Sequence, residues 1–204
     1  MGLAQQGMHP EAFQKALMGY LQFRQLGKLS AKPVLSIIDF SLPSNRQRLW
    51  VIDLAKQQVL FHCLVAHGVN SGLHYAQKFS NREGSQQSSL GFYITGATYQ
   101  GKHGLSLYLN GQEARFNSNA RRRAIVMHGA AYVSWTHVAA MGRIGRSQGC
   151  PAVPENLAAD IIHTIKEGTC LYIYHPSREY HRFSKWGRMM QWDYQWLAFL
   201  PFAI

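Results

Sequence analysis

Acidic residues are scarce in this 204-residue chain: ten Asp and Glu stand against 21 Lys and Arg, and the formal net charge at pH 7 is +11. A charge of this sign fits a polyanionic or membrane-proximal setting. The basic residues are scattered, however, and form one tight cluster, Arg121-Arg122-Arg123. Because nucleic-acid surfaces interleave a basic face with stacking aromatics or carry a module signature, the composition argues against a nucleic-acid partner.

Long apolar runs are also missing. No segment approaches the roughly 18 uncharged apolar residues of a membrane span. Residues 1–17 lack the basic start and the continuous apolar core of a secretory signal. Two locations stay open as expectations: the cell envelope or periplasm if a signal was removed ahead of Met1, or the cytoplasm if Met1 is the native start.

Cysteines are few. The three thiols make an odd number without CxxC spacing, which argues against a disulfide framework and a zinc site. Cys63 and Cys170 lie in apolar runs and are predicted to be small buried residues of strands. Cys150 differs because it lies between Gly149 and Pro151, in a predicted turn, where its thiol can be presented to a cleft.

A histidine-based metal site is not predicted either. His62, His67 and His74 follow the spacing H-x4-H-x6-H. In a continued strand the first two would point to opposite faces, since their separation is odd. We therefore expect no metal ligand set in this segment.

Short β-rich runs separated by turn residues begin at Val34. Strands are predicted over residues 34–40, 48–54, 59–68, 90–99, 101–111, 124–128 and 169–175, the second and third as a hairpin. Helices are predicted over 9–26, where Pro10 suits an early position, and over 154–166, ended by Gly168. The first helix is expected to pack on the outside of the domain.

Three parts are predicted along the chain: an N-terminal helical element (1–28) packed on the domain, a main domain (29–178) and an aromatic-rich tail (179–204). The polar stretch 70–89 has little periodicity, as is typical of a functional or mobile segment. The rings of the tail are expected to dock on the domain, with a partner or a membrane surface as the alternative.

Residues 125–153 carry a candidate catalytic pair. A β-branched run ends in His128-Gly129, and a glycine-containing turn, Ser147-Gln148-Gly149-Cys150, precedes the second predicted helix. A thiol is mostly protonated near pH 7, so a cysteine nucleophile needs a base, and an imidazole at a strand end supplies one at a fixed distance. The alternative is a chance pairing of a lone His and a lone Cys.

The remaining parts of such a site are also present in the stretch. No carboxylate occurs between residues 125 and 153, so the Gly129 carbonyl is the candidate that orients the imidazole. Backbone N–H groups of Gln148, Gly149 and Cys150 are candidates to stabilise an oxyanion.

These motifs resemble the signature of L,D-transpeptidase (YkuD-type) catalytic domains, in which HG or HS is followed at a distance by SHGC. The murein L,D-transpeptidase branch is similar over further segments in the expected order: IIDFSLPSNRQRLWVIDL, LVAHGVNSG, FSNREGSQQSSLGFYITG, GKHGLSLYLNG and GRSQGCPAVP. The resemblance covers roughly residues 13–176.

The resemblance implies a mostly β fold, sandwich- or barrel-like, with peripheral helices (α+β) and no metal or organic cofactor. The implied partner is the stem peptide of peptidoglycan. Cys150 would attack the diaminopimelate carbonyl that precedes a terminal D-alanine and form an acyl-enzyme. An amine acceptor then gives a 3–3 cross-link, whereas water gives L,D-carboxypeptidase activity. Another alternative is a non-catalytic module that binds cell wall or membrane through its charge and aromatic tail.

The resemblance also implies roles for single residues. His128 is the base, Gly129 orients its ring, and Gly149 and Cys150 are the main oxyanion donors, in a turn shared with Ser147 and Gln148. The chain departs from the pattern at Gln148, where His is usual, and at Ala152, where Arg is frequent.

Substrate contacts are predicted at five further positions. Arg143 and Arg146, just upstream of the turn, are the expected substitutes for the arginine missing at 152. His103 and Tyr108 are candidates to line the cleft, and Ser89 is a candidate to contact substrate. An ordinary surface, core or turn-capping role is the alternative for the last three.

Overall fold

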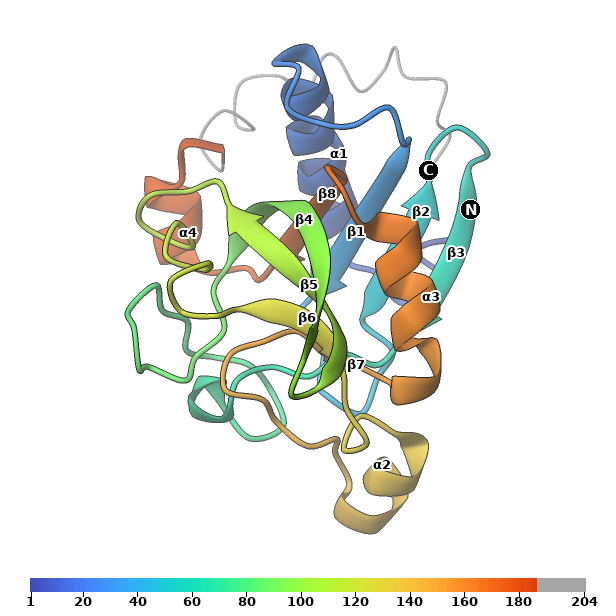
Figure 1. The fold of residues 1–204 in the computed structure, drawn as a ribbon, viewed down its shortest axis with the longest axis vertical. Coiled ribbons are helices and arrows are strands. Elements are labelled where there is room, and N and C mark those ends of the chain that lie inside the picture. The colour runs from blue at the N-terminus through green and yellow to red at the C-terminus, as the bar shows by residue number, and fades with distance from the viewer. Residues whose placement is uncertain (187–204) are drawn as a thin grey trace.

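One eight-stranded sheet organises the computed structural model, which describes residues 1–186 (Figure 1). The strand order is β3-β2-β1-β8-β4-β5-β6-β7. Neighbours are antiparallel except in the pairs β1–β8 and β6–β7, which are parallel. The strands are β1 (Val34–Asp39), β2 (Leu49–Asp53), β3 (Gln58–Cys63), β4 (Gly91–Gly101), β5 (Gly104–Gly111), β6 (Val126–Gly129), β7 (Ala152–Val153) and β8 (Cys170–Tyr174).

Four α-helices accompany the sheet within the described residues: α1 (Pro10–Gln25), α2 (Trp135–Met141), α3 (Glu155–Ile165) and α4 (Arg178–Phe183). A 3-10 turn, η1, covers Val69–Ser71. Figure 1 shows α1 and α2 at opposite ends of the molecule. The predicted mostly β, barrel-like fold with peripheral helices is confirmed.

The predicted hairpin is confirmed as β2 and β3, but the predicted strand 59–68 was too long, because β3 ends at Cys63. The next residues leave the sheet ladder while their apolar side chains stay buried, among them Leu64 and Ala66. Ala66 N–H donates to the Ala152 carbonyl at 2.8 Å, so the segment continues toward β7 instead of along β2. Apolar composition alone does not distinguish these two destinations.

Helix α1 packs on β1 and β8, as predicted for the outside of the domain. Its buried face includes Ala12, Ala16 and Phe23. Gly19 is required at the contact, since a Cβ atom there would lie 2.2 Å from Phe92 Cζ. The helix therefore meets the sheet more closely than any larger residue would allow.

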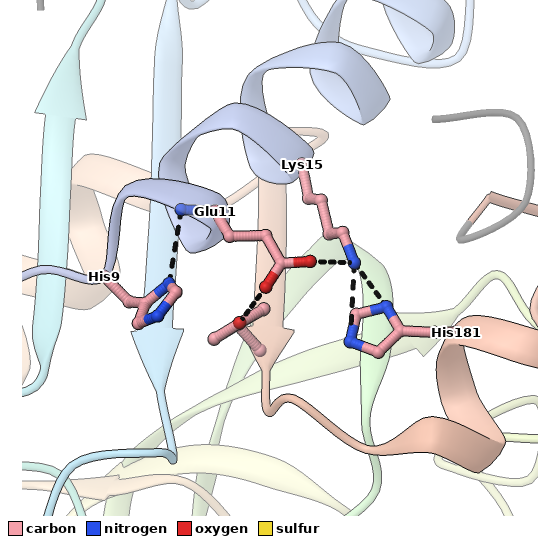
Figure 2. Close-up of polar contacts among 5 residues, drawn as sticks. His9, Glu11, Lys15 and His181 are labelled. Carbon is pink, nitrogen blue, oxygen red and sulfur yellow. Dashed lines mark hydrogen bonds and ion pairs between the residues drawn. The ribbon is translucent and has the colours of Figure 1, made fainter. Parts of the chain in front are cut away.

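Polar side chains connect the first and last described helices (Figure 2). Glu11 pairs with Lys15 Nζ at 2.7 Å and accepts a hydrogen bond from Tyr174 OH at 2.6 Å. Lys15 Nζ also contacts the ring of His181 on α4. Burial, followed by the nearby Lys15 ammonium, lowers the pKa of His181, which keeps that ring neutral beside the ammonium.

The first part of the predicted tail contacts the domain. Tyr180 is buried and donates to Glu113 at 2.7 Å, and Trp186 packs against Phe23 with ring centroids 4.5 Å apart. The aromatic residues from Trp192 onward lie outside the described residues. The division of the chain at residues 28 and 178 stays a prediction.

Candidate active site

Strands β6 and β7 bring the predicted base and nucleophile to one side of the sheet. His128 on β6 lies opposite Ala152 on β7, two residues after Cys150. Cys150 Sγ lies 3.6 Å from the Ala124 carbonyl O and interacts with the Val126 backbone, at the start of β6. Because side chains two apart share a face, His128 follows Val126 on the same face, about 7 Å further along the strand.

Both side chains line one cavity of about 480 Å³. Residues from four further regions complete its wall: the segment before β4, the β4–β5 hairpin, the residues leading into β6, and the chain between β6 and β7. They include Gln86, Lys102, His103, Arg123, Tyr132 and Arg146. A thiol, an imidazole and several cations therefore face a common space.

His128 is held in one orientation. The residue is 3% exposed, and its Nδ1 lies 2.8 Å from the Gly129 carbonyl O. Since a carbonyl only accepts, Nδ1 carries the proton and Nε2 is left as an acceptor. Burial lowers the pKa of His128; the Gly129 hydrogen bond opposes this shift, whereas the nearby His103 and Lys102 add to it. The imidazole is therefore neutral at pH 7.

Cys150 is half-buried, and this burial raises the pKa of its thiol. The Val126 backbone and the charges of Arg123 and Lys102 act in the opposite direction and favour the thiolate. The resting pair at neutral pH is then a protonated thiol and a neutral imidazole. Such a pair needs the imidazole to remove the proton during attack, as general-base catalysis does.

The turn before Cys150 is closed by Ser147. Its Oγ accepts from the Gly149 N–H at 3.0 Å and donates to the Cys150 carbonyl at 2.6 Å. Gly149 has φ +118°, and a Cβ atom there would lie 2.8 Å from the Gln87 carbonyl O and 2.9 Å from Ile125 Cδ1. Glycine is therefore required both by its backbone angle and by the close neighbours.

The same hydrogen bonds determine which of the predicted oxyanion donors already have an acceptor. Ser147 Oγ engages the Gly149 N–H, so this donor must exchange partners before it can bind an oxyanion. The N–H groups of Gln148 and Cys150 donate to no acceptor within residues 1–186. They are therefore candidates for oxyanion binding that need no exchange of partners, and the predicted roles of the turn stay predictions.

Two predicted substrate-binding residues line the cavity. Arg146 Nη1 donates to the carbonyls of Val69 at 2.9 Å and Gly72 at 3.1 Å, which fixes its side chain at the rim. His103 stacks on His128 with ring centroids 4.3 Å apart and an interplanar angle of 16°. His103 thus contacts the candidate base directly.

Three other predicted residues do not line this cavity. Arg143 donates to the Ile144 carbonyl at 2.9 Å, and Ser89 is 1% exposed and donates to the Ser80 carbonyl at 2.8 Å. The ring of Tyr108 is covered by Tyr99 on one side and Arg121 on another. These three side chains are engaged by neighbouring groups and are not part of the cavity wall, although Tyr99, which stacks on Tyr108, does line the cavity.

Sequence reasoning missed several residues of the cavity wall, among them Tyr99, Lys102, Arg123 and Tyr132. Burial raises the pKa of Tyr132 to about 12, so its hydroxyl stays protonated. Arg123 was interpreted only as part of a basic cluster. Its place directly before a strand that ends in the candidate base was the available signal.

The three clustered histidines each have a different environment. His62 stacks on Trp50, His67 bonds to Arg48, and His74 contacts Tyr75 edge-on. Residues 1–186 hold no group of three His, Cys, Asp or Glu side chains arranged for a metal ion. Within the same residues, no helix has both the length and the apolar character of a membrane span.

A mostly β domain whose histidine and cysteine share one cavity is the arrangement of a candidate cysteine acyltransferase. The sequence profile of the L,D-transpeptidase catalytic domain matches residues 4–174, and the chain belongs to this family. The predicted resemblance is thus confirmed. No curated protein matches the chain.

Several solved structures resemble the chain at low identity. LdtMt1 in complex with imipenem and an L,D-transpeptidase from Mycobacterium smegmatis each show 13% identity and a TM-score of 0.41, covering 70% of this chain and 59% of theirs. Pgp2, a helical cell shape determining protein from Campylobacter jejuni, shows 11% identity and a TM-score of 0.45, covering 92% of this chain and 66% of its own. The chain spans 59% of the length of the first two relatives.

Proposed function

We propose that the protein is a cysteine-dependent L,D-transpeptidase that acts on the tetrapeptide stems of peptidoglycan. The observation that carries this proposal is the shared cavity of Cys150 and His128, with the Gly129 carbonyl holding Nδ1 so that Nε2 is left as a base. Membership of the catalytic domain family supports the same reaction. With assembled peptidoglycan as its substrate, the protein is proposed to act in the cell envelope.

The first half-reaction forms an acyl-enzyme. His128 Nε2 takes the thiol proton as Cys150 Sγ attacks the carbonyl between diaminopimelate and D-alanine. The N–H groups of Gln148 and Cys150 donate to the resulting oxyanion. The C–N bond then breaks, and the imidazolium returns its proton to the departing amine of D-alanine.

The second half-reaction regenerates the thiol. An amine of a neighbouring stem attacks the thioester carbonyl, and His128 accepts the proton that this amine loses. The C–S bond breaks, Cys150 leaves as a thiol with the proton from His128, and the new amide is a 3–3 cross-link. Water in place of the amine gives a tripeptide stem, the carboxypeptidase outcome.

Substrate carboxylates need a cation in this cavity, and position 152 does not supply one. Ala152 is buried in the sheet opposite His128 and packs in a small apolar cluster with Leu64 and Ile144. An arginine there would bury its charge, which is costly without a partner. Arg146 and Lys102 line the cavity and are the cations proposed to bind carboxylate.

Product analysis tests the proposal. Purified protein is incubated with disaccharide tetrapeptides, and the products are identified by mass spectrometry. Release of D-alanine with dimers indicates transpeptidation, and release with tripeptides alone indicates hydrolysis. Cys150→Ala should abolish D-alanine release, while Cys63→Ala, a buried thiol in a strand, serves as the matched control. Full turnover by Cys150→Ala contradicts the nucleophile assignment, and absence of both products from the native protein supports a non-catalytic binding module.

A further inference from the structure

The segment 80–89 lies directly against the nucleophile turn. Ser88 Oγ donates to the Gly149 carbonyl at 3.3 Å and accepts from the Gly68 N–H at 3.0 Å. The Gln87 carbonyl O would lie 2.8 Å from a Cβ atom at Gly149. Gly84 and Gln86 of the same segment line the cavity. The position of this segment therefore sets the space in which the turn adopts its conformation.

Arg123 binds this segment at four points. Nη1 donates to the Ser80 carbonyl at 2.5 Å and to Ser89 Oγ. Nη2 donates to Ser85 Oγ at 3.1 Å and to the Gln87 carbonyl at 2.5 Å. The segment contains no helix or strand of its own. Few backbone hydrogen bonds hold it, such as that from Ser80 N–H to the Ser88 carbonyl, so the side-chain bonds of Arg123 add to its definition. The planar guanidinium suits this task because its donors have a fixed geometry.

Arg123 also lies close to the reacting group. It lies three positions before Val126, the first residue of β6, and lines the cavity that Cys150 faces. Its charge lowers the pKa of the Cys150 thiol, and the other cation acting in this direction is Lys102. Burial lowers the pKa of Arg123 itself, whereas the nearby Tyr93 and Cys150 raise it.

We propose that Arg123 is a positioning residue of the active site, which holds segment 80–89 against the nucleophile turn and thereby fixes the backbone of Gly149 and Cys150. The effect of this role on catalysis rests on the proposed function. The hydrogen bonds that position the segment do not depend on a substrate. Neighbouring Arg122 contacts the same segment only through an exposed ion pair with Glu83, which contributes little, and it also donates to Asn119 Oδ1.

The variant Arg123→Lys tests the positioning of segment 80–89 separately from the positive charge at residue 123. An ammonium retains the positive charge but cannot reach four separated acceptors, so segment 80–89 should loosen. Hydrogen exchange measured by mass spectrometry should be faster in peptides covering 80–89 and 145–151, while peptides from β1 and β8 keep the native rate. In Arg122→Gln, the matched control, both regions should exchange as in the native protein. Unchanged exchange in 145–151 in Arg123→Lys overturns the proposal.

Alkylation of Cys150 by iodoacetamide, measured as a function of pH, tests whether the charge of Arg123 also acts on the thiol. A purely structural role of Arg123 would leave this pH profile unchanged. Arg123→Gln removes the charge and should raise the apparent thiol pKa, slowing alkylation near pH 8 by about tenfold per unit of that rise. Arg123→Lys should keep the native profile. An unshifted profile in Arg123→Gln refutes the electrostatic contribution.

Ser85→Ala keeps the proposal testable if the Arg123 variants unfold. It removes one of the four acceptors and leaves the charge in place, so exchange in 145–151 should still accelerate without a change in the alkylation profile.

With muropeptides, Arg123→Lys should reduce kcat about 10-fold or more, because small misplacements of reacting groups slow catalysis strongly. If the native protein releases no D-alanine while exchange responds as expected, the proposed function fails and the positioning role stands.

Discussion

His67 and His128 are both buried histidines with a lowered pKa, yet the structure uses them differently. His67 is 0% exposed, and both ring nitrogens are engaged: Nδ1 accepts from Arg48 Nη2 at 2.8 Å, and Nε2 donates to the Gly72 carbonyl at 3.2 Å. His128 has one nitrogen bound to Gly129, and its ring lines the cavity that Cys150 shares. An uncommitted nitrogen beside a cavity, rather than burial, distinguishes the candidate base.

Arg48 explains why His67 must be neutral. The guanidinium is fully buried and donates to the carbonyls of Leu42 and Val65 as well as to His67. Burial lowers the pKa of Arg48 to about 9, so it stays charged at neutral pH. Burial and this charge together lower the pKa of His67 to about 3. The Gly72 carbonyl also accepts from Arg146, which connects the buried pair to the cavity rim.

The largest expected effect concerns catalysis. His128→Ala should reduce D-alanine release by about 10²- to 10⁴-fold, the usual contribution of a general base. Because its Nδ1 bond is local, the melting temperature should change little. Steady-state rates with muropeptides and a thermal melt measure both quantities. A variant that melts far below the native protein would assign His128 a structural role like that of His67.

The second effect concerns stability. His67→Ala leaves a buried Arg48 donor without an acceptor and should destabilise the fold by about 2–4 kcal/mol. Urea unfolding measures the loss. His67→Gln is the matched control, because its amide carbonyl can accept from Arg48 and should recover part of the stability. Equal losses in the two variants would refute the Arg48–His67 bond as the cause.

Acid should destabilise the native protein through His67. The folded pKa of about 3 lies below the ordinary histidine value of 6.5, so between these values the unfolded chain binds a proton that the folded chain excludes. Stability present above pH 6.5 is therefore lost as pH falls toward 3, by at most about 5 kcal/mol. In His67→Gln the fall with pH should be shallower. Parallel curves of unfolding free energy against pH for both proteins contradict this assignment.

The acid limb of the pH–rate profile should report His128. Neutral imidazole is required, so kcat/KM should rise with pH through an apparent pKa below 6.5 and then level off. His103→Leu removes the stacked ring whose charge lowers the pKa of His128, and should move the limb to higher pH. A limb that stays in place in His103→Leu excludes this coupling.

The smallest effect is a selective chemical label. A carbapenem should add its mass once, at Cys150, which faces the cavity. Cys63 should stay unmodified, because burial raises its pKa to about 12, and Cys170 should do the same, because burial raises its pKa further. Peptide mapping locates the adduct, and label on either strand cysteine contradicts their burial.

Regular elements were predictable because their patterns are local. The helix at α1, the hairpin of β2 and β3 and the strand at β8 follow from periodicity and turn residues. The two-residue strand β7 and the short helices α2 and α4 were not predicted. A strand this short has no period, and it exists because β6 provides its partner. The aromatic composition of the tail likewise concealed the helix α4.

The candidate site was predicted in part, for a similar reason. His128, Gly129 and Cys150 belong to a motif whose residues are close in sequence, so the motif identified them. Arg123 acts on residues more than thirty positions earlier, and Ser89 is directed to it instead of toward the cavity. Such long-range hydrogen bonds have no sequence pattern, since only the folded backbone fixes which acceptors meet.

The family, the mostly β architecture and the histidine–cysteine candidates follow from residue type, local period and motif order, which are properties of the sequence. Folding, in contrast, sets which of two buried histidines keeps a nitrogen beside the cavity and which arginine binds the segment next to the nucleophile turn. Both depend on where distant carbonyls and side chains come together. Hydrogen-bond partners and solvent exposure are properties of that arrangement, not of the residues themselves.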